Sequence, residues 1–133
     1  MTAASVRRFV QERAGGRCEY CRLPQRVSDL PFHVEHVVAM QHHGDDDASN
    51  LALACDRCNL YKGPNLSGID PQSQEVVPLF HPRTDAWDEH FVFRGAEIIG
   101  ITPTGRATVR LLNMNALRRV RLREELLGSG ELL

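Results

Sequence analysis

The chain has 133 residues, 42% of them hydrophobic and 25% charged, with 16 Lys and Arg against 17 Asp and Glu. These values match ordinary globular proteins and disfavour a disordered or fibrous chain, and the length suits one domain over residues 1–133. No apolar run approaches the ~20 residues of a membrane span, and the first residues lack the apolar core of a signal peptide. A cytoplasmic protein is therefore expected, in a compartment that keeps thiols reduced.

The arginines are concentrated in two segments, although the net charge is only −1. Residues 1–26 carry six arginines against two glutamates, and residues 118–123 carry four more. Clustered arginines are typical of phosphate-binding surfaces, which depend on local charge more than on the total. They are equally typical of solvated helix faces, so the pattern leaves both interpretations open. The four later arginines are Arg118, Arg119, Arg121 and Arg123.

The first half of the chain is predicted to form a helix, a long hairpin and a second helix. Val6, Phe9 and Val10 have the i, i+3, i+4 spacing of a helix face, and the Gly15-Gly16 pair ends that helix. Short runs rich in β-branched and aliphatic residues favour strands. In chain order we expect a helix over 3–14, a tight turn over 18–21, strands over 32–38 and 51–54 joined by the polar loop 41–49, and a helix over 55–62.

The second half is predicted to be an extension of a hairpin and helices over about residues 75–128. Gly63-Pro64 is a strong helix stop, and Thr102-Pro103 caps and starts a later helix. Asn115 is the expected cap of the last helix. In chain order we expect a loop over 64–74, a short strand over 76–80, a hairpin of 90–94 and 96–102 turning at Gly95, a helix from 103, and a helix to about Leu127 that Gly128 ends.

Four cysteines occur as two C-x-x-C pairs, Cys18 with Cys21 and Cys55 with Cys58. Two such pairs are the commonest way to surround a tetrahedral Zn²⁺, and four thiolates leave no open position, so the expected zinc is structural. The alternatives are four buried free thiols or a redox C-x-x-C, and no second motif of a redox fold accompanies either pair.

A polar centre is expected beside the cysteines. On the predicted helix, Asn59 follows Cys55 and Cys58 at helical spacing and so shares their face. Glu35 and His36 come from the first strand. A carboxylate and an amide oxygen suit a hard cation such as Mg²⁺, and a neighbouring His can accept a proton from a water that attacks a phosphate.

These residues resemble the HNH endonuclease family in its four-cysteine form. The resemblance rests on Glu35-His36, Asn50-Leu51 and the run from Cys55 to Gly63, and covers about residues 17–64. It implies an α+β protein with a ββα-metal core, a structural zinc on four cysteines, an N-terminal helix, and a C-terminal hairpin and helices outside the core.

The resemblance also implies residue roles. His36 corresponds to the general base, Asn50 to the residue that braces the loop between the strands, and Glu35 and Asn59 to the ligands of a catalytic Mg²⁺ or Mn²⁺ ion. We expect Lys62, Arg57 and Arg17 to contact DNA, with an exposed helix-end lysine as the alternative for Lys62.

The sequence departs from the family pattern at three places. Glu35 stands where Asp is usual, no Pro follows His36 closely, and His43-Gly44 replaces a Gly-Gly pair. In addition, consecutive strand residues face opposite sides of a sheet. Glu35 and His36 therefore reach one phosphate together only where the strand ends or twists.

Several polar residues have open roles at this point. His33 is a further ligand or a partly buried neighbour, and Trp87 either stacks on a base or belongs to the core. The remaining candidates are solvated loop residues or phosphate and cation contacts. They are His42, His43, Asp45, Asp46 and Asp47. In the C-terminal half, His81, Arg83 and His90 form a concentrated polar-aromatic set with Trp87, and their roles are open.

The expected function is a metal-dependent DNA endonuclease or nickase in which His36 activates the attacking water. A rival from another class is a zinc-stabilised module that binds DNA or protein without cleaving it, and a weaker one binds an acidic or membrane partner through the arginines. A pure binding module needs none of His36, Asn50 and Asn59. One active centre makes nicking the default for a monomer, whereas a paired cut requires a dimer.

Overall fold

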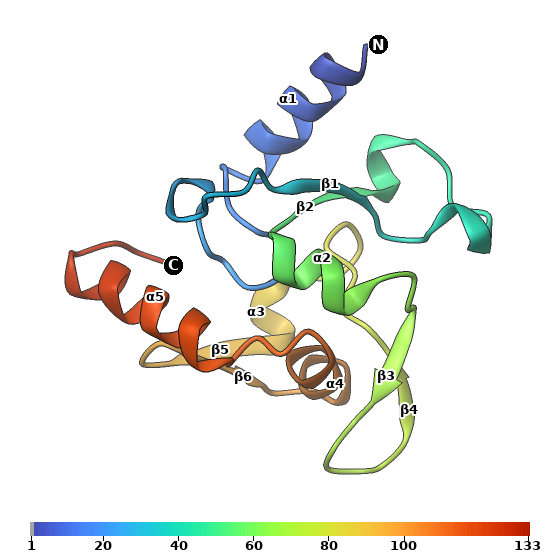
Figure 1. The fold of residues 1–133 in the computed structure, drawn as a ribbon. Coiled ribbons are helices and arrows are strands. Elements are labelled where there is room, and N and C mark those ends of the chain that lie inside the picture. The colour runs from blue at the N-terminus through green and yellow to red at the C-terminus, as the bar shows by residue number, and fades with distance from the viewer. Residues whose placement is uncertain (1) are drawn as a thin grey trace.

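The computed structural model describes residues 2–133, which form a mixed α+β protein with three two-stranded antiparallel sheets (Figure 1). None of the helices in that range is long and apolar enough to cross a membrane. The helices are α1 (Ala3–Arg13), α2 (Asp56–Lys62), α3 (Trp87–His90), α4 (Pro103–Leu111) and α5 (Leu117–Gly128). The strands are β1 (His33–His36), β2 (Leu51–Ala54), β3 (Ser67–Ile69), β4 (Val76–Pro78), β5 (Phe91–Arg94) and β6 (Glu97–Gly100).

The hairpin of β1 and β2 with the following helix α2 confirms the expected ββα arrangement. β1 pairs antiparallel with β2, with Glu35 opposite Ala52 and His36 opposite Leu51. All four residues of β2 are buried, so both faces of that strand are covered. Both α1 and α2 contact β2, and the terminal nitrogens of Arg13 on α1 donate to the carbonyls of Leu51 and Ala48, at 2.6 and 2.9 Å.

The loop between the two strands is more ordered than the sequence suggested. It contains two 3-10 turns, Met40–His42 and Ala48–Asn50. β1 ends at His36, two residues earlier than expected, because the Val38 amide bonds to the Asn50 side chain instead of a partner strand. Gly44 lies so close to Val38 that a Cβ there would stand 1.7 Å from the Val38 carbonyl oxygen. The loop therefore requires glycine at position 44.

The extension contains two elements that were not predicted, β3 and α3. β3 lies inside the segment expected to be a loop, and it pairs with β4 across a turn closed by Asp70. The Asp70 carboxylate accepts bonds from the amides of Gln72 and Ser73, and Arg106 of α4 donates to both of its oxygens at 2.8 and 2.9 Å. Side-chain contacts therefore hold a hairpin in a polar stretch with weak strand signals.

The hairpin of β5 and β6 and the start of α4 confirm the prediction, since the hairpin turns at Gly95 and Thr102 caps the helix. The predicted cap of the last helix was wrong. Ala116 takes that position, while the Asn115 side chain bonds to both the amide and the carbonyl of Ile98 on β6. Asn115 therefore joins the last helix to the hairpin and does not cap it.

An aromatic cluster joins the extension to the cysteine region. Trp87 packs against Phe91 and Phe93, with ring centroids 5.0 and 5.2 Å apart, and Phe80 lies edge-on to Tyr20. The Trp87 indole donates to the Tyr20 carbonyl at 2.9 Å. Trp87 is thus a core residue and is not free to stack on a base.

Candidate functional site

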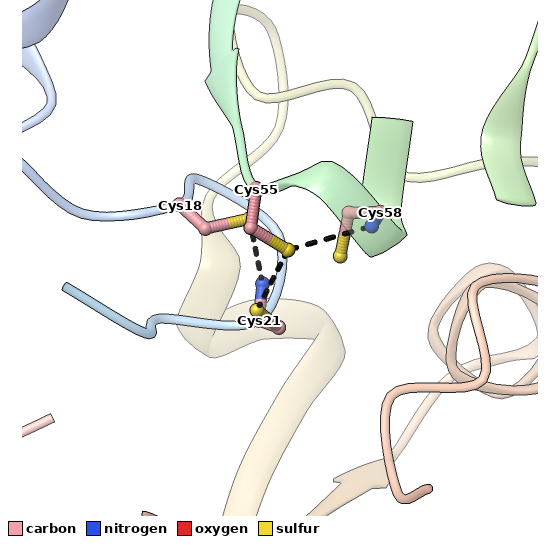
Figure 2. A group of neighbouring side chains, drawn as sticks. All are labelled: Cys18, Cys21, Cys55 and Cys58. Atoms are coloured by element: carbon pink, nitrogen blue, oxygen red, sulfur yellow. Dashed lines mark hydrogen bonds between the residues drawn. The ribbon is translucent and has the colours of Figure 1, made fainter. Parts of the chain in front are cut away.

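The sulfur atoms of Cys18, Cys21, Cys55 and Cys58 converge at the end of the hairpin (Figure 2). All four sulfurs lie within 4.8 Å of one another, and the Cys21 and Cys55 sulfurs are 3.7 Å apart. Zn–S bonds of about 2.3 Å in a tetrahedron put the sulfurs about 3.8 Å apart. All four residues are buried, so the cluster has the donor set, size and enclosure of a structural zinc site.

The local backbone explains why the cysteines converge. Cys55 caps α2, and its sulfur accepts from the Cys58 amide at 3.4 Å, while the Cys18 sulfur accepts from the Cys21 amide at 3.5 Å. In each C-x-x-C turn, the amide of the second cysteine thus donates to the sulfur of the first. Burial raises the pKa of Cys18 and of Cys58, so a bound cation is what would keep these sulfurs as thiolates.

Arg119 of α5 closes the cluster from the other side, and the sequence had given no reason to place it there. Its guanidinium is 2.7 Å from the Cys58 sulfur and 3.7 Å from the Cys55 sulfur. It also donates to the carbonyls of Leu112 and Asn113, at 2.6 and 2.8 Å. Burial alone lowers the pKa of Arg119, but the nearby thiolates outweigh burial and raise it.

The arginine segment 118–123 is therefore not a uniform surface. Arg119 and Arg123 are buried, while Arg118 and Arg121 are exposed. Arg123 donates to the Ala96 and Met114 carbonyls, both at 2.7 Å. Two of these four arginines are therefore buried and bonded within the protein, which neither interpretation of the sequence predicted.

Glu35 lies inside the protein, between the cysteine turn and α2. The Tyr20 hydroxyl donates to one carboxylate oxygen, and the Lys62 ammonium lies 3.5 Å from the other. Burial raises the pKa of Glu35, and Lys62 opposes that shift. Only 4% of the Glu35 side chain is exposed. Its carboxylate is thus engaged by two protein partners.

Two of the three expected DNA contacts are also engaged within the protein. Lys62 is 2% exposed and donates to the Val37 carbonyl at 2.9 Å, so the expected phosphate contact was wrong: the ammonium pairs with Glu35. Arg17 pairs with Glu131 at 2.6 Å and donates to a backbone carbonyl. Arg57, on the outer face of α2, is exposed.

His36 is the half-buried last residue of β1 and has an acidic partner. Its Nε2 atom is 2.7 Å from an Asp46 carboxylate oxygen. An ionised carboxylate only accepts hydrogen bonds, so in the neutral ring Nε2 carries the proton and Nδ1 keeps its lone pair. Asp45 and Asp47 instead accept from nearby loop amides. Within the acidic run, Asp46 alone reaches a histidine.

Asn50 braces the loop that carries Asp46. Its side-chain oxygen accepts from the Val38 amide at 2.9 Å, and its side-chain nitrogen donates to the carbonyls of Val38 and Asp45 at 3.0 and 2.8 Å. Asn50 is buried. It therefore fixes the loop geometry without facing an open surface.

An open pocket of about 350 Å³ lies beside β1 and brings several predicted residues together. His36 and Asn59 line it with His33, and Glu35 is also among the lining residues. The side-chain hydrogen bonds at the end of α2 are made by Lys62 and Asn65, and none among the described residues involves the Asn59 side chain. Its amide oxygen is therefore free to bind a ligand. A histidine with a free lone pair next to a free amide oxygen can take a proton and hold a cation.

The remaining histidines lie outside this pocket. His42 and His43 are exposed. His81 accepts the Arg83 amide at 3.1 Å through Nδ1, and His90 bonds to Thr102 at 2.6 Å. The last two therefore have structural partners.

Among known protein families, the model described as HNH endonuclease matches residues 18–65. The match begins at the first cysteine and ends just after α2, so it contains the cysteine cluster, the hairpin and the pocket. Searches of curated proteins and of solved structures found no match.

Proposed function

We propose that the protein is a metal-dependent endonuclease that hydrolyses phosphodiester bonds in DNA, on the basis of the match of residues 18–65 to the HNH endonuclease family. The observation that carries the proposal is the His36–Asp46 contact on the wall of the pocket. It holds the imidazole in the form that leaves Nδ1 able to accept a proton. A zinc-stabilised binding module has no use for such an arrangement.

In the proposed reaction His36 is the general base. A water between His36 and the phosphate loses its proton to Nδ1 as its oxygen attacks phosphorus. The P–O bond to the leaving sugar oxygen breaks, and that oxygen takes up a proton from solvent. Asp46 orients the ring and stabilises the imidazolium that forms. General-base catalysis of this kind contributes typically ~10²–10⁴-fold in rate.

Two kinds of metal ion belong to the proposal. The cysteine cluster would hold a structural Zn²⁺, for which its sulfur spacing is suitable. A Mg²⁺ or Mn²⁺ ion, when bound at the pocket, would neutralise charge on the phosphate and the leaving oxygen. The free amide of Asn59 fits such an ion. The Glu35 carboxylate does not fit it, because both of its oxygens already have protein partners.

The contacts that cross the chain support treating residues 1–133 as one domain. Trp87 and Arg119, both outside the family match, bond to the turn and the cysteines within it. DNA is the proposed substrate, and Arg57 is the one proposed contact that is exposed. One proposed active centre per chain makes nicking the expected outcome for a monomer.

Nicking of supercoiled plasmid tests the proposal. We expect zinc-loaded protein to nick plasmid with Mg²⁺ or Mn²⁺, and His36→Ala to lower the rate at least 100-fold while keeping the circular dichroism spectrum. His42→Ala is the matched control, because it removes an exposed histidine from the loop that follows β1. Equal rates for wild type and His36→Ala would reject the proposal.

The rival function is a zinc-stabilised module that binds DNA without cutting it. The pairing of the Glu35 carboxylate with Tyr20 and Lys62 favours this rival, because an unpaired carboxylate at that position would be available to a metal ion. Plasmid binding with no nicking by the wild-type protein, in any divalent cation, would support it.

A further inference from the structure

The Glu35 carboxylate is already bound by side chains of the protein itself. Tyr20 and Lys62 occupy its two oxygens, and Lys62 is as buried as its partner. Turning the carboxylate toward the pocket would leave the ammonium of Lys62 buried without its counter-ion, which is strongly unfavourable. Glu35 therefore holds β1 against α2, and an ion in the pocket needs another protein ligand.

His33 lies two residues before Glu35 and so on the same face of β1. His33 lines the pocket with Asn59, and 43% of its side chain is exposed. Its Nε2 atom is 3.4 Å from a carboxylate oxygen of Asp56. Because the carboxylate only accepts, Nε2 carries the proton in the neutral ring and Nδ1 is left with its lone pair.

The two histidines of β1 have similar surroundings. His33 and His36 each have an acidic partner on Nε2, Asp56 and Asp46 respectively, and each lines the same pocket. A histidine that binds a metal almost always donates its other ring N–H to a carboxylate, a carbonyl or water. Asp56 is placed to be that partner for His33, and it lies one turn before Asn59 on α2.

We propose that His33, through Nδ1, and Asn59, through its amide oxygen, hold the catalytic divalent ion, and that Glu35 is a positioning residue. This rests on the proposed function. Among the described residues, no cluster of three or more His, Cys, Asp and Glu ligand atoms as close as the cysteines occurs at the pocket, so water and phosphate oxygens complete the coordination. An imidazole ligand favours transition metals, and affinity rises from Mn²⁺ to Co²⁺ and Ni²⁺. The ion is therefore of this class, in preference to Mg²⁺.

Binding of Mn²⁺ without DNA tests the site independently of cleavage. The free Mn²⁺ signal in electron paramagnetic resonance is measured during titration of the zinc-loaded protein. We expect His33→Ala and Asn59→Ala each to weaken binding at least tenfold, and Glu35→Gln to change it less than twofold. His42→Ala is the control and should bind as wild type. His33→Asp should restore binding and shift the preference toward Mg²⁺.

The results of this titration distinguish failure of the proposed metal site from failure of the proposed cleavage reaction. Loss of Mn²⁺ binding in Glu35→Gln, with binding retained in His33→Ala, would overturn the inference. If Glu35→Gln does not fold, the double variant Glu35→Gln, Lys62→Met removes both buried charges and serves in its place. Wild-type protein that binds Mn²⁺ through His33 but nicks no plasmid would reject the proposed function and keep the site. Wild-type protein that binds no Mn²⁺ would reject the site.

Discussion

Replacing Arg119 with glutamine is expected to destabilise the zinc-loaded protein strongly. Arg119 is 4% exposed, and its guanidinium donates to two carbonyls and to the Cys58 sulfur. A hydrogen bond to a charged group contributes ~1.5–3 kcal/mol, and breaking a buried ion pair costs about 3–5 kcal/mol. Glutamine can keep one of these contacts. We therefore expect the free energy of unfolding to fall by about 3–5 kcal/mol.

The electrostatic part of the expected loss of stability in Arg119→Gln depends on zinc binding by the cysteines. Four thiolates around one Zn²⁺ leave two negative charges in a buried site, and Arg119 is the cation that bonds to them. Urea unfolding should be measured with excess zinc and again after chelation, when only the two carbonyl bonds are at stake. Zinc release to a chromogenic chelator should be at least tenfold faster in Arg119→Gln than in wild type.

Arg118→Gln is the matched control, because Arg118 is the exposed neighbour on the same helix. Exposed substitutions of this kind usually change stability by less than about 0.5 kcal/mol. If Arg119→Gln unfolds and releases zinc like Arg118→Gln, Arg119 does not support the cluster. A loss that is identical with and without zinc would refute the role of the thiolate charge and leave only the carbonyl bonds.

Three further predictions concern charges elsewhere in the fold. Lys62→Met should lower the free energy of unfolding by about 3–5 kcal/mol in urea titrations, because its carboxylate partner would stay buried and unpaired. Arg106 holds the pKa of Asp70 well below its usual range. The pair therefore stabilises the fold above about pH 4, and this contribution is lost as the pH falls further. Asp70→Asn should flatten the fall in melting temperature between about pH 5 and pH 2. Asp46→Asn should slow plasmid nicking about tenfold with little change in KM, because it frees the His36 ring, whereas Asp45→Asn should not.

The sequence was sufficient for the parts of the protein that local rules determine. The C-x-x-C pairs predicted the cysteine cluster. Gly95 and Thr102 marked a turn and a cap that the structure contains. In each case the information lies within a few residues of the feature.

Contacts between distant residues were not predictable in the same way. Nothing near Lys62 shows that its ammonium is buried against Glu35, 27 positions earlier, and nothing near Arg119 indicates a cysteine cluster. Both are long cationic side chains, which are mostly exposed, so their burial follows only from how α2 and α5 pack. Asp46 was indistinguishable from its two acidic neighbours until the loop geometry brought it to His36.

The contacts that enclose the cysteine cluster also imply an order of events during folding. The Trp87 bond to Tyr20 and the Arg119 bond to Cys58 join residues that are 67 and 61 positions apart. Such distant contacts form late, because a long loop must close first. The four sulfurs can capture an ion as soon as the hairpin forms, while α5 still leaves one side open. We therefore expect refolding protein to take up zinc quickly and to become resistant to chelators in a slower, separate phase.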